Sequence, residues 1–142
     1  MKSRRTLKGA IKELDKHFSL FIRLRDSNEN GYGQCVTCGD WRYFKRADNG
    51  HFVKRQYKST RFDERNCALQ CKRCNGFEQG RDDVFAEKIK ERWGDEVLQS
   101  LKLRRDFEKR TPTKLYVFEL EGLIARYKRK VKQLLNEKNI KV

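Results

Sequence analysis

Long apolar segments are missing from this chain. No stretch approaches the ~18 consecutive apolar residues that a membrane-spanning helix needs, so the sequence argues against a membrane protein. The basic residues 1–5 are followed by no apolar run of the kind that a signal peptide carries. We therefore expect a cytoplasmic protein in a reducing environment, where paired cysteines indicate metal or redox chemistry rather than disulfides.

Acidic residues are outnumbered by basic ones, and proline is scarce. The 142 residues include 20 Asp and Glu against 35 Lys and Arg, a net charge of +15, and only one proline. Charged residues make up 39% of the chain, which approaches the composition of a disordered protein, but 11% aromatics and periodic apolar segments argue against disorder. The basic excess runs along the whole chain, and such a field attracts polyphosphates. The composition therefore indicates long charged helices with small cores, and nucleic acid as the partner.

Apolar residues at helical spacing mark both ends of the chain. The stripe from Leu7 to Phe21 predicts a helix over about residues 6–25, and the stripe from Val117 to Leu134 predicts the last helix. Two matching stripes can pack on each other within one chain or pair between two chains as a homodimer. Packing within one chain is the simpler arrangement.

The centre of the chain has a different character. It contains all five cysteines, four of them in pairs, with several glycines and short β-type segments, and helices are expected over 82–94 and 95–110. The segment around Pro112 is expected to break the helical pattern, and the next helix is expected to begin there, with the proline in its first turn. We predict an α+β fold, in which a metal-nucleated, hairpin-rich module is flanked by long basic helices. By sequence the chain divides into an N-terminal helix (residues 1–30), a central module (31–95) and C-terminal helices (96–142).

The four paired cysteines have the spacing of one tetrahedral zinc site. Cys35 and Cys38 form one C-x-x-C pair, and Cys71 and Cys74 form the other. Two intervening residues let both thiolates of a pair face one point, so two such pairs complete a structural Zn²⁺ site. A thioredoxin-like redox motif would instead begin a helix in a βαβ pattern, which this region does not suggest. The odd cysteine, Cys67, is expected to be a small buried hydrophobe.

Further polar residues lie between and beside the cysteine pairs. Gly50-His51-Phe52 lies between the pairs, Asn66 precedes the second pair by five residues, and Asn75 follows it directly. This order resembles the HNH, or ββα-metal, nucleases. Together with residues 61–65, Gln70, Gly80 and Trp93-Gly94, it more closely resembles the NinG/Rap family of phage recombination endonucleases. The similarity covers roughly residues 33–95.

The resemblance implies a zinc-stabilised nuclease that uses Mg²⁺ or Mn²⁺ to cut branched recombination intermediates such as Holliday junctions and D-loops. A histidine with an ordinary pKa of ~6.5 suits a general base near neutral pH, and His51 takes that role. By resemblance, Asn66 braces the loop and orients His51. Asn75 takes the position of the last ligand of the catalytic ion, and an amide oxygen can bind such a hard cation.

One residue departs from the HNH pattern. Many HNH enzymes carry an Asp or His ligand directly before the general base, where this chain has Gly50. Glycine has no side chain to offer, so another residue must supply the carboxylate. The alternatives are Asp48, or Asp63 and Glu64 from the neighbouring segment.

Basic residues gather around His51 and within the second cysteine pair. Such residues contact phosphates and fix the register on DNA without reading its sequence. The expected DNA-binding residues are Lys54, Arg55, Lys58, Arg61, Arg65, Lys72 and Arg73.

Three functions fit these features. The first is a structure-selective endodeoxyribonuclease acting on branched or duplex DNA, alone or with recombination proteins as partners. The second is a non-catalytic, zinc-stabilised module for DNA binding or recruitment, and the third is an RNA-binding zinc protein. A histidine with two placed asparagines favours the first, because neither of the others needs a general base.

Overall fold

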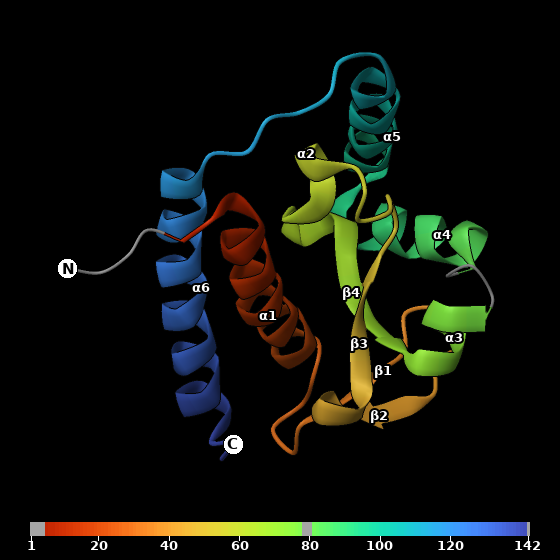
Figure 1. Cartoon of the computed structure of the whole chain (residues 1–142). Helices are drawn as coiled ribbons and strands as arrows, with labels where there is room; N and C mark the ends of the chain where they lie inside the picture. Colours follow the sequence, from red (N-terminus) through yellow and green to blue (C-terminus); the bar gives the residue numbers. More distant parts are fainter. Residues whose placement is uncertain (1–4, 78–80, 142) are drawn as a thin grey trace.

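The computed structural model describes residues 5–77 and 81–141, so that Gly80 of the motif lies outside the described residues. Figure 1 shows helices packed around two small antiparallel sheets, which confirms the predicted mixed α+β class. The helices are α1 (Leu7–Arg25), α2 (Lys58–Arg61), α3 (Lys72–Phe77), α4 (Asp82–Trp93), α5 (Asp95–Arg110) and α6 (Val117–Lys138). The strands are β1 (Tyr32–Gln34), β2 (Trp41–Tyr43), β3 (Ala47–His51) and β4 (Cys67–Cys71), and two 3-10 turns are η1 (Phe44–Arg46) and η2 (Glu64–Asn66).

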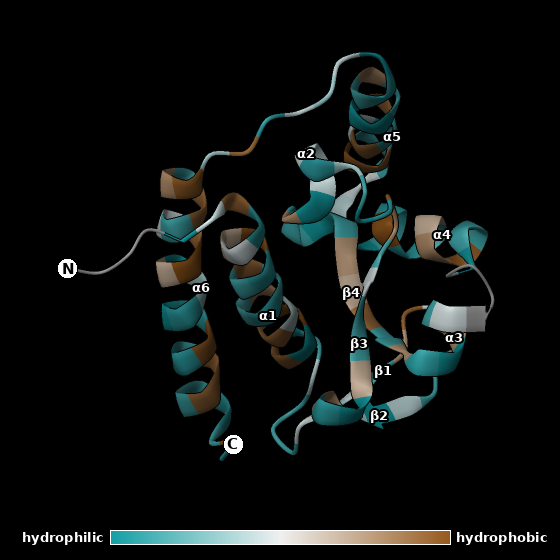
Figure 2. Ribbon diagram, viewed as in Figure 1, coloured by the Kyte–Doolittle hydropathy of each residue, from teal (hydrophilic) through white to brown (hydrophobic). Residues whose placement is uncertain are grey.

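The terminal helices α1 and α6 pack on each other. Thr6 caps α1 by accepting a hydrogen bond from the backbone N–H of Gly9 (3.0 Å), which sets the start that the stripe predicts. Phe18 of α1 meets Tyr127 of α6 edge to face, with ring centroids 5.0 Å apart. In Figure 2, hydrophobic segments recur between hydrophilic ones along α6. The buried residues of this core include Leu14, Phe18, Phe21, Leu120, Ile124, Tyr127 and Val131.

The two apolar stripes thus cover each other within one chain, as the simpler arrangement predicts. A homodimer, which stays a prediction, would have to use another surface. No helix in the described part of the chain is both long and apolar enough to cross a membrane.

The second core lies under α4 and α5. Phe85 and Ile89 of α4 pack with Leu98 and Leu101 of α5 against the segment that follows β3. The two helices meet at Gly94, whose φ of +100° suits glycine and whose N–H caps α4 on the carbonyl of Lys90 (2.9 Å). The boundaries expected at 82–94 and 95–110 are therefore confirmed.

The expected helical restart at Pro112 is wrong. Helix α5 ends at Arg110 and α6 begins only at Val117, so Pro112 lies in an extended connection. The hydroxyl of Thr113 donates to Glu108 (3.0 Å) and Leu115 packs against the α1–α6 core, which draws the segment out between the two helices. Figure 1 shows this connection as a long crossing from α5 to α6.

Strands β3 and β4 form the hairpin that carries most of the candidate site. They pair antiparallel, with Ala47 opposite Cys71 at one end and His51 opposite Cys67 at the other. Helix α3 follows β4 without a break, so the chain runs strand, strand, helix through this region. The loop between the strands contains α2 and η2.

Candidate functional site

Four cysteine sulfurs converge between the β1–β2 turn and the start of α3. The Sγ atoms of Cys35, Cys38, Cys71 and Cys74 all lie within 4.8 Å of one another, and those of Cys38 and Cys71 are 3.8 Å apart. A tetrahedral zinc ion with Zn–S bonds of ~2.3 Å separates its sulfurs by ~3.8 Å. The predicted ligand set is therefore brought together, and it can bind a structural metal such as zinc.

Backbone N–H groups prepare these sulfurs to act as ligands. The N–H of Cys71 donates to Sγ of Cys35 (3.3 Å), and the N–H of Cys74 donates to Sγ of Cys71 (3.4 Å). Burial raises the pKa of Cys35, but N–H donors from Cys38 and Cys71 outweigh it and bring the pKa to about 6. Burial raises the pKa of Cys71 to about 12. Metal ligands of this kind are thiolates, so a bound cation favours loss of their protons.

Cys67 lies apart from this cluster. It is buried with residues of the α1–α6 core, and burial raises the pKa of its thiol. This is the small buried hydrophobe that the sequence suggests.

His51 ends strand β3 and is nearly enclosed. Its Nε2 lies 2.9 Å from the carbonyl oxygen of Arg61, and only 8% of the residue is exposed. A carbonyl can only accept, so Nε2 carries the proton and Nδ1 has the free lone pair. Burial lowers the pKa of His51 to about 4, and the positive charge of Arg55 adds to the effect. At neutral pH the ring is therefore uncharged, and it is a weaker base than a histidine with an ordinary pKa.

Asn66 closes the loop that holds the Arg61 carbonyl. Its Oδ1 accepts from the N–H of Val53 (2.8 Å), and its Nδ2 donates to the carbonyls of Val53 (3.0 Å) and Thr60 (3.1 Å). Asn66 has no exposed surface, so each of these bonds forms away from water. The side chain ties the start of the loop to the residue before Arg61, which is the bracing position that the resemblance implies.

Asp48 and Asn75 lie side by side where β3 meets α3. Oδ2 of Asp48 accepts from Nδ2 of Asn75 (3.1 Å), and Oδ1 accepts from Nζ of Lys72 (2.6 Å). The other proposed carboxylates serve elsewhere. Asp63 pairs with Arg65 and with Arg104 of α5, and Glu64 pairs with Tyr127 and Lys130 of α6. Of the alternatives left open by the sequence, Asp48 is the one that contacts Asn75.

Strand geometry separates this pair from the histidine. Asp48 and His51 are three residues apart in β3, which is ~10 Å along a strand, and odd spacing places them on opposite faces. The candidate site therefore has two parts, a histidine end and an Asp48–Asn75 end.

Close packing against Gln70 explains why residue 50 is a glycine. The side chain of Gln70 lies across it, and a Cβ at position 50 would come within 2.9 Å of the Cβ of Gln70. This face of the hairpin therefore has no room for a side chain at position 50.

Five of the seven expected DNA-binding residues form ion pairs inside the molecule. Arg55 and Arg61 both pair with Asp15 of α1, and Lys54 pairs with Asp82 of α4 (3.0 Å). Arg65 and Lys72 pair with Asp63 and Asp48, as described above. Lys58 and Arg73 form no ion pair within the described ranges 5–77 and 81–141. The local count of charges around His51 therefore overstated the basic field, because distant helices supply acids.

Comparison with known proteins places the chain in a family. Residues 1–137 match the family model described as bacteriophage lambda NinG protein. The chain belongs to the NinG family. It is 28% identical over 130 residues to proteins named ninG from Escherichia phage 933W and from Enterobacteria phage VT2-Sa. The aligned part is 91% of this chain and 60% of each relative, so the chain spans about three-fifths of the relatives' length. No solved structure matches it.

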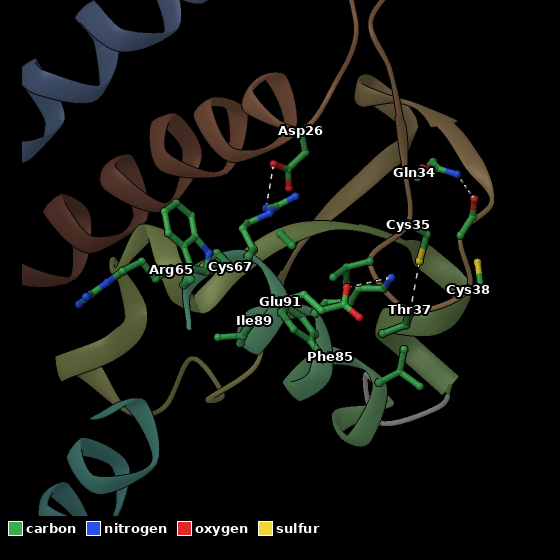
Figure 3. Close-up of a pocket in the computed structure, with 17 residues that line it drawn as sticks. Asp26, Gln34, Cys35, Thr37, Cys38, Arg65, Cys67, Phe85, Ile89 and Glu91 are labelled. Atoms are coloured by element: carbon green, nitrogen blue, oxygen red, sulfur yellow. Dashed lines mark hydrogen bonds and ion pairs between the residues drawn. The ribbon is translucent and has the colours of Figure 1, made fainter. Parts of the chain in front are cut away.

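A groove that sequence reasoning missed lies beside the metal centre of this NinG-family chain. An open cavity of about 660 Å³ separates the first cysteine pair from α4, with Phe85, Ile89 and Cys67 among its apolar lining residues and Arg65 and Glu91 among its charged ones (Figure 3). Its walls come from segments far apart in sequence. Several motif residues line it, among them Cys35, Cys38, Arg65 and Trp93, but their spacing in the sequence did not indicate a groove.

Proposed function

We propose that this chain is a metal-dependent endodeoxyribonuclease of the HNH type that cuts branched recombination intermediates such as Holliday junctions and D-loops. Membership of the NinG family and the ordered motif support the proposal. The observation that carries it is the state of His51, a buried and neutral imidazole whose Nε2–H is committed to the Arg61 carbonyl. In this state Nδ1 is the nitrogen that can act as a general base.

The chain's own residues supply most of the chemistry. Nδ1 of His51 takes the proton from the water that attacks the scissile phosphate. Asn66 keeps the loop closed so that the Arg61 carbonyl fixes the ring during that transfer. Lys58 and Arg73, together with the exposed side of Arg55, hold neighbouring phosphates.

The Asp48–Asn75 end fits a divalent cation. Asn75 donates to Asp48 through its nitrogen, so its amide oxygen remains available beside a carboxylate. Mg²⁺ in proteins takes one or two such oxygens and completes its shell with water and phosphate. When bound, Mg²⁺ or Mn²⁺ supplies positive charge that stabilises the phosphate and the leaving 3′ oxygen.

A second function is favoured by a specific observation. Asp48 and His51 lie ~10 Å apart along β3 and on opposite faces, so cleavage requires the DNA backbone to reach both faces of the hairpin. A non-catalytic, zinc-stabilised module for DNA binding or recruitment has no such requirement. We place this binding function second because it does not require the His51 ring to be fixed by the Arg61 carbonyl.

The two functions are separated by one assay. Four-way junctions, flaps, D-loops and linear duplex are incubated with the chain and Mg²⁺ or Mn²⁺, and with chelator as the reference. The nuclease proposal expects cleavage of branched DNA only with the ion. Asn75→Ala should slow cleavage and be partly rescued by a higher ion concentration. Tight binding of every branched substrate with no cleavage under any metal would favour the second function.

A further inference from the structure

The β1–β2 hairpin presents aromatic side chains to solvent. Tyr32 pairs with Tyr43 and Gln34 pairs with Trp41, so these four side chains share one face of the sheet. Tyr32 is 46% exposed and Trp41 is 56% exposed, whereas Tyr43 is half-buried beneath Tyr32 with ring centroids 5.3 Å apart. Two large aromatic side chains on one face of this hairpin are therefore open to water.

The opposite face of the hairpin fixes it to the rest of the molecule. Gly33 lies so close to the backbone of Asp26 and the side chain of Leu69 that a Cβ would not fit there. The turn between the strands contains Cys35 and Cys38 of the metal centre, and the N–H of Cys35 donates to the carbonyl of Asp40 (2.8 Å). The aromatic face is therefore held in place on a rigid support.

Basic residues border this face. Lys45 and Arg46 lie in η1, the turn after β2, and are exposed, and neither forms an ion pair within the part of the chain that the structure describes. The nearby acid, Asp40, pairs instead with Arg42, at 3.5 Å. Aromatic rings beside unpaired cations, on a chain of net charge +15, match a ligand that combines flat π-faces with negative charge.

We propose that the aromatic face of Tyr32, Trp41 and Tyr43 is a stacking platform for unpaired bases of DNA. Bases that are unstacked at a branch point lie on Trp41 and Tyr32, while their phosphates contact Lys45 and Arg46. Every base has a π-face, so this contact selects for unpaired DNA and not for sequence. The inference rests on the proposed function in taking DNA as the ligand, and it gives that function a source of preference for branched over linear duplex.

The test uses fluorescence of Trp41 in the full chain. Trp93→Phe removes the other tryptophan, so that the remaining signal reports on the platform. Oligothymidine, blunt duplex and a four-way junction are titrated without divalent ions, which prevents cleavage. We expect strong quenching of Trp41 by oligothymidine, weaker quenching by the junction and little change with the duplex.

Affinity measurements give the second readout. Trp41→Ala and Tyr32→Ala should each weaken oligothymidine binding roughly tenfold, since one stacked base is lost, and Trp41→Phe should restore part of it. The matched control is Phe118→Ala, which removes an aromatic that is 75% exposed at the start of α6, away from the hairpin in Figure 1. The control should bind as the parent does. Zinc content is measured for each variant, and Tyr32 lies at the end of the hairpin remote from the zinc turn.

The outcomes separate this inference from the nuclease proposal. Unchanged oligothymidine affinity in both alanine variants, with zinc retained, overturns the platform even if the chain cuts junctions. Quenching of Trp41 in a chain that cuts nothing supports the platform and counts against the nuclease. If the two variants lose only binding to a protein partner, the face is a protein-docking surface and the inference is wrong.

Discussion

Nε2 of His51 lies 2.9 Å from the carbonyl oxygen of Arg61, ten residues further along the chain. The contact exists because Asn66 closes the intervening loop on Val53 and Thr60. It fixes which nitrogen of the ring carries a proton, and enclosure by the same loop keeps the ring uncharged. The pH behaviour of the chain and its proposed catalysis therefore depend on one loop.

Replacement of His51 by alanine should abolish cleavage. Loss of a general base costs ~10²–10⁴ in rate, whereas zinc content and junction affinity should stay close to the parent values. The matched control is His17→Ala. His17 pairs with Glu13 within α1 (2.9 Å) and lies on a different element from His51, so its loss should be silent in the cleavage assay. Cleavage by the His51 variant at the parent rate would remove the nuclease assignment from this site.

The same histidine should make stability depend on pH. Burial lowers the pKa of His51 to about 4 in the folded chain, against ~6.5 when unfolded. Between these values the unfolded chain binds a proton that the folded chain does not, so the free energy of unfolding falls as pH drops from 6.5 toward 4. The expected loss at pH 4.5 is about 2 kcal/mol. Urea unfolding at pH 7 and 4.5 measures it, and His51→Gln, which cannot be protonated, should lose correspondingly less.

Removal of zinc should unfold the central hairpins. The four thiolates hold the β1–β2 turn to α3, and in such sites the binding energy is folding energy. We expect one zinc ion per chain, and a loss of circular dichroism when a chelator removes it. Cys71→Ser should lose the metal. Cys67→Ala is the matched control, because Cys67 is buried outside the cluster, and this variant should keep its zinc. A metal-free chain with an unchanged spectrum would contradict the prediction.

Local signals explain what the sequence could predict. Thr6 and Gly94 set helix ends through contacts within four residues. The two-residue spacing within each cysteine pair likewise brings both sulfurs to one point. Strands β1 and β2 are only three residues long, too short for a period-2 pattern, so the shared face of Tyr32 and Trp41 could not be read from the chain.

Contacts between distant segments account for the rest. Asp15 and Asp82 neutralise cations around His51, yet they lie 36 residues before it and 31 after it. Pairing of this kind is decided by how helices pack, and a local count of charges does not contain it. The alternation of side chains along a strand predicts that Asp48 and His51 lie on opposite faces, but the sequence did not show that both belong to one strand.

Two arginines that share Asp15 should behave differently. Arg55 is 59% exposed, so Arg55→Ala should weaken DNA binding and reduce the slope of log K against log salt by about one. Arg61 is 16% exposed and is committed to Asp15, so Arg61→Ala should instead lower the free energy of unfolding by roughly 1–3 kcal/mol. The parent slope should be about −4 if about four phosphates are neutralised. Salt titrations and thermal unfolding of both variants check this, and equal effects of the two on stability would contradict it.

A side chain at position 50 should destabilise the chain and add no metal ligand. The Cβ of Gly50→Ala would meet Gln70, which is fully buried, and such overpacking costs roughly 1–3 kcal/mol. Gly50→Asp, which restores the usual HNH residue, should cost more because it also buries a charge. The matched control is Gly122→Ala in α6, where an added Cβ meets nothing within 4 Å. That variant should gain about 0.5–1 kcal/mol from helix propensity. Denaturant unfolding gives the three values, and a Gly50→Asp variant that folds normally and cleaves faster would show that the hairpin has room for the missing ligand.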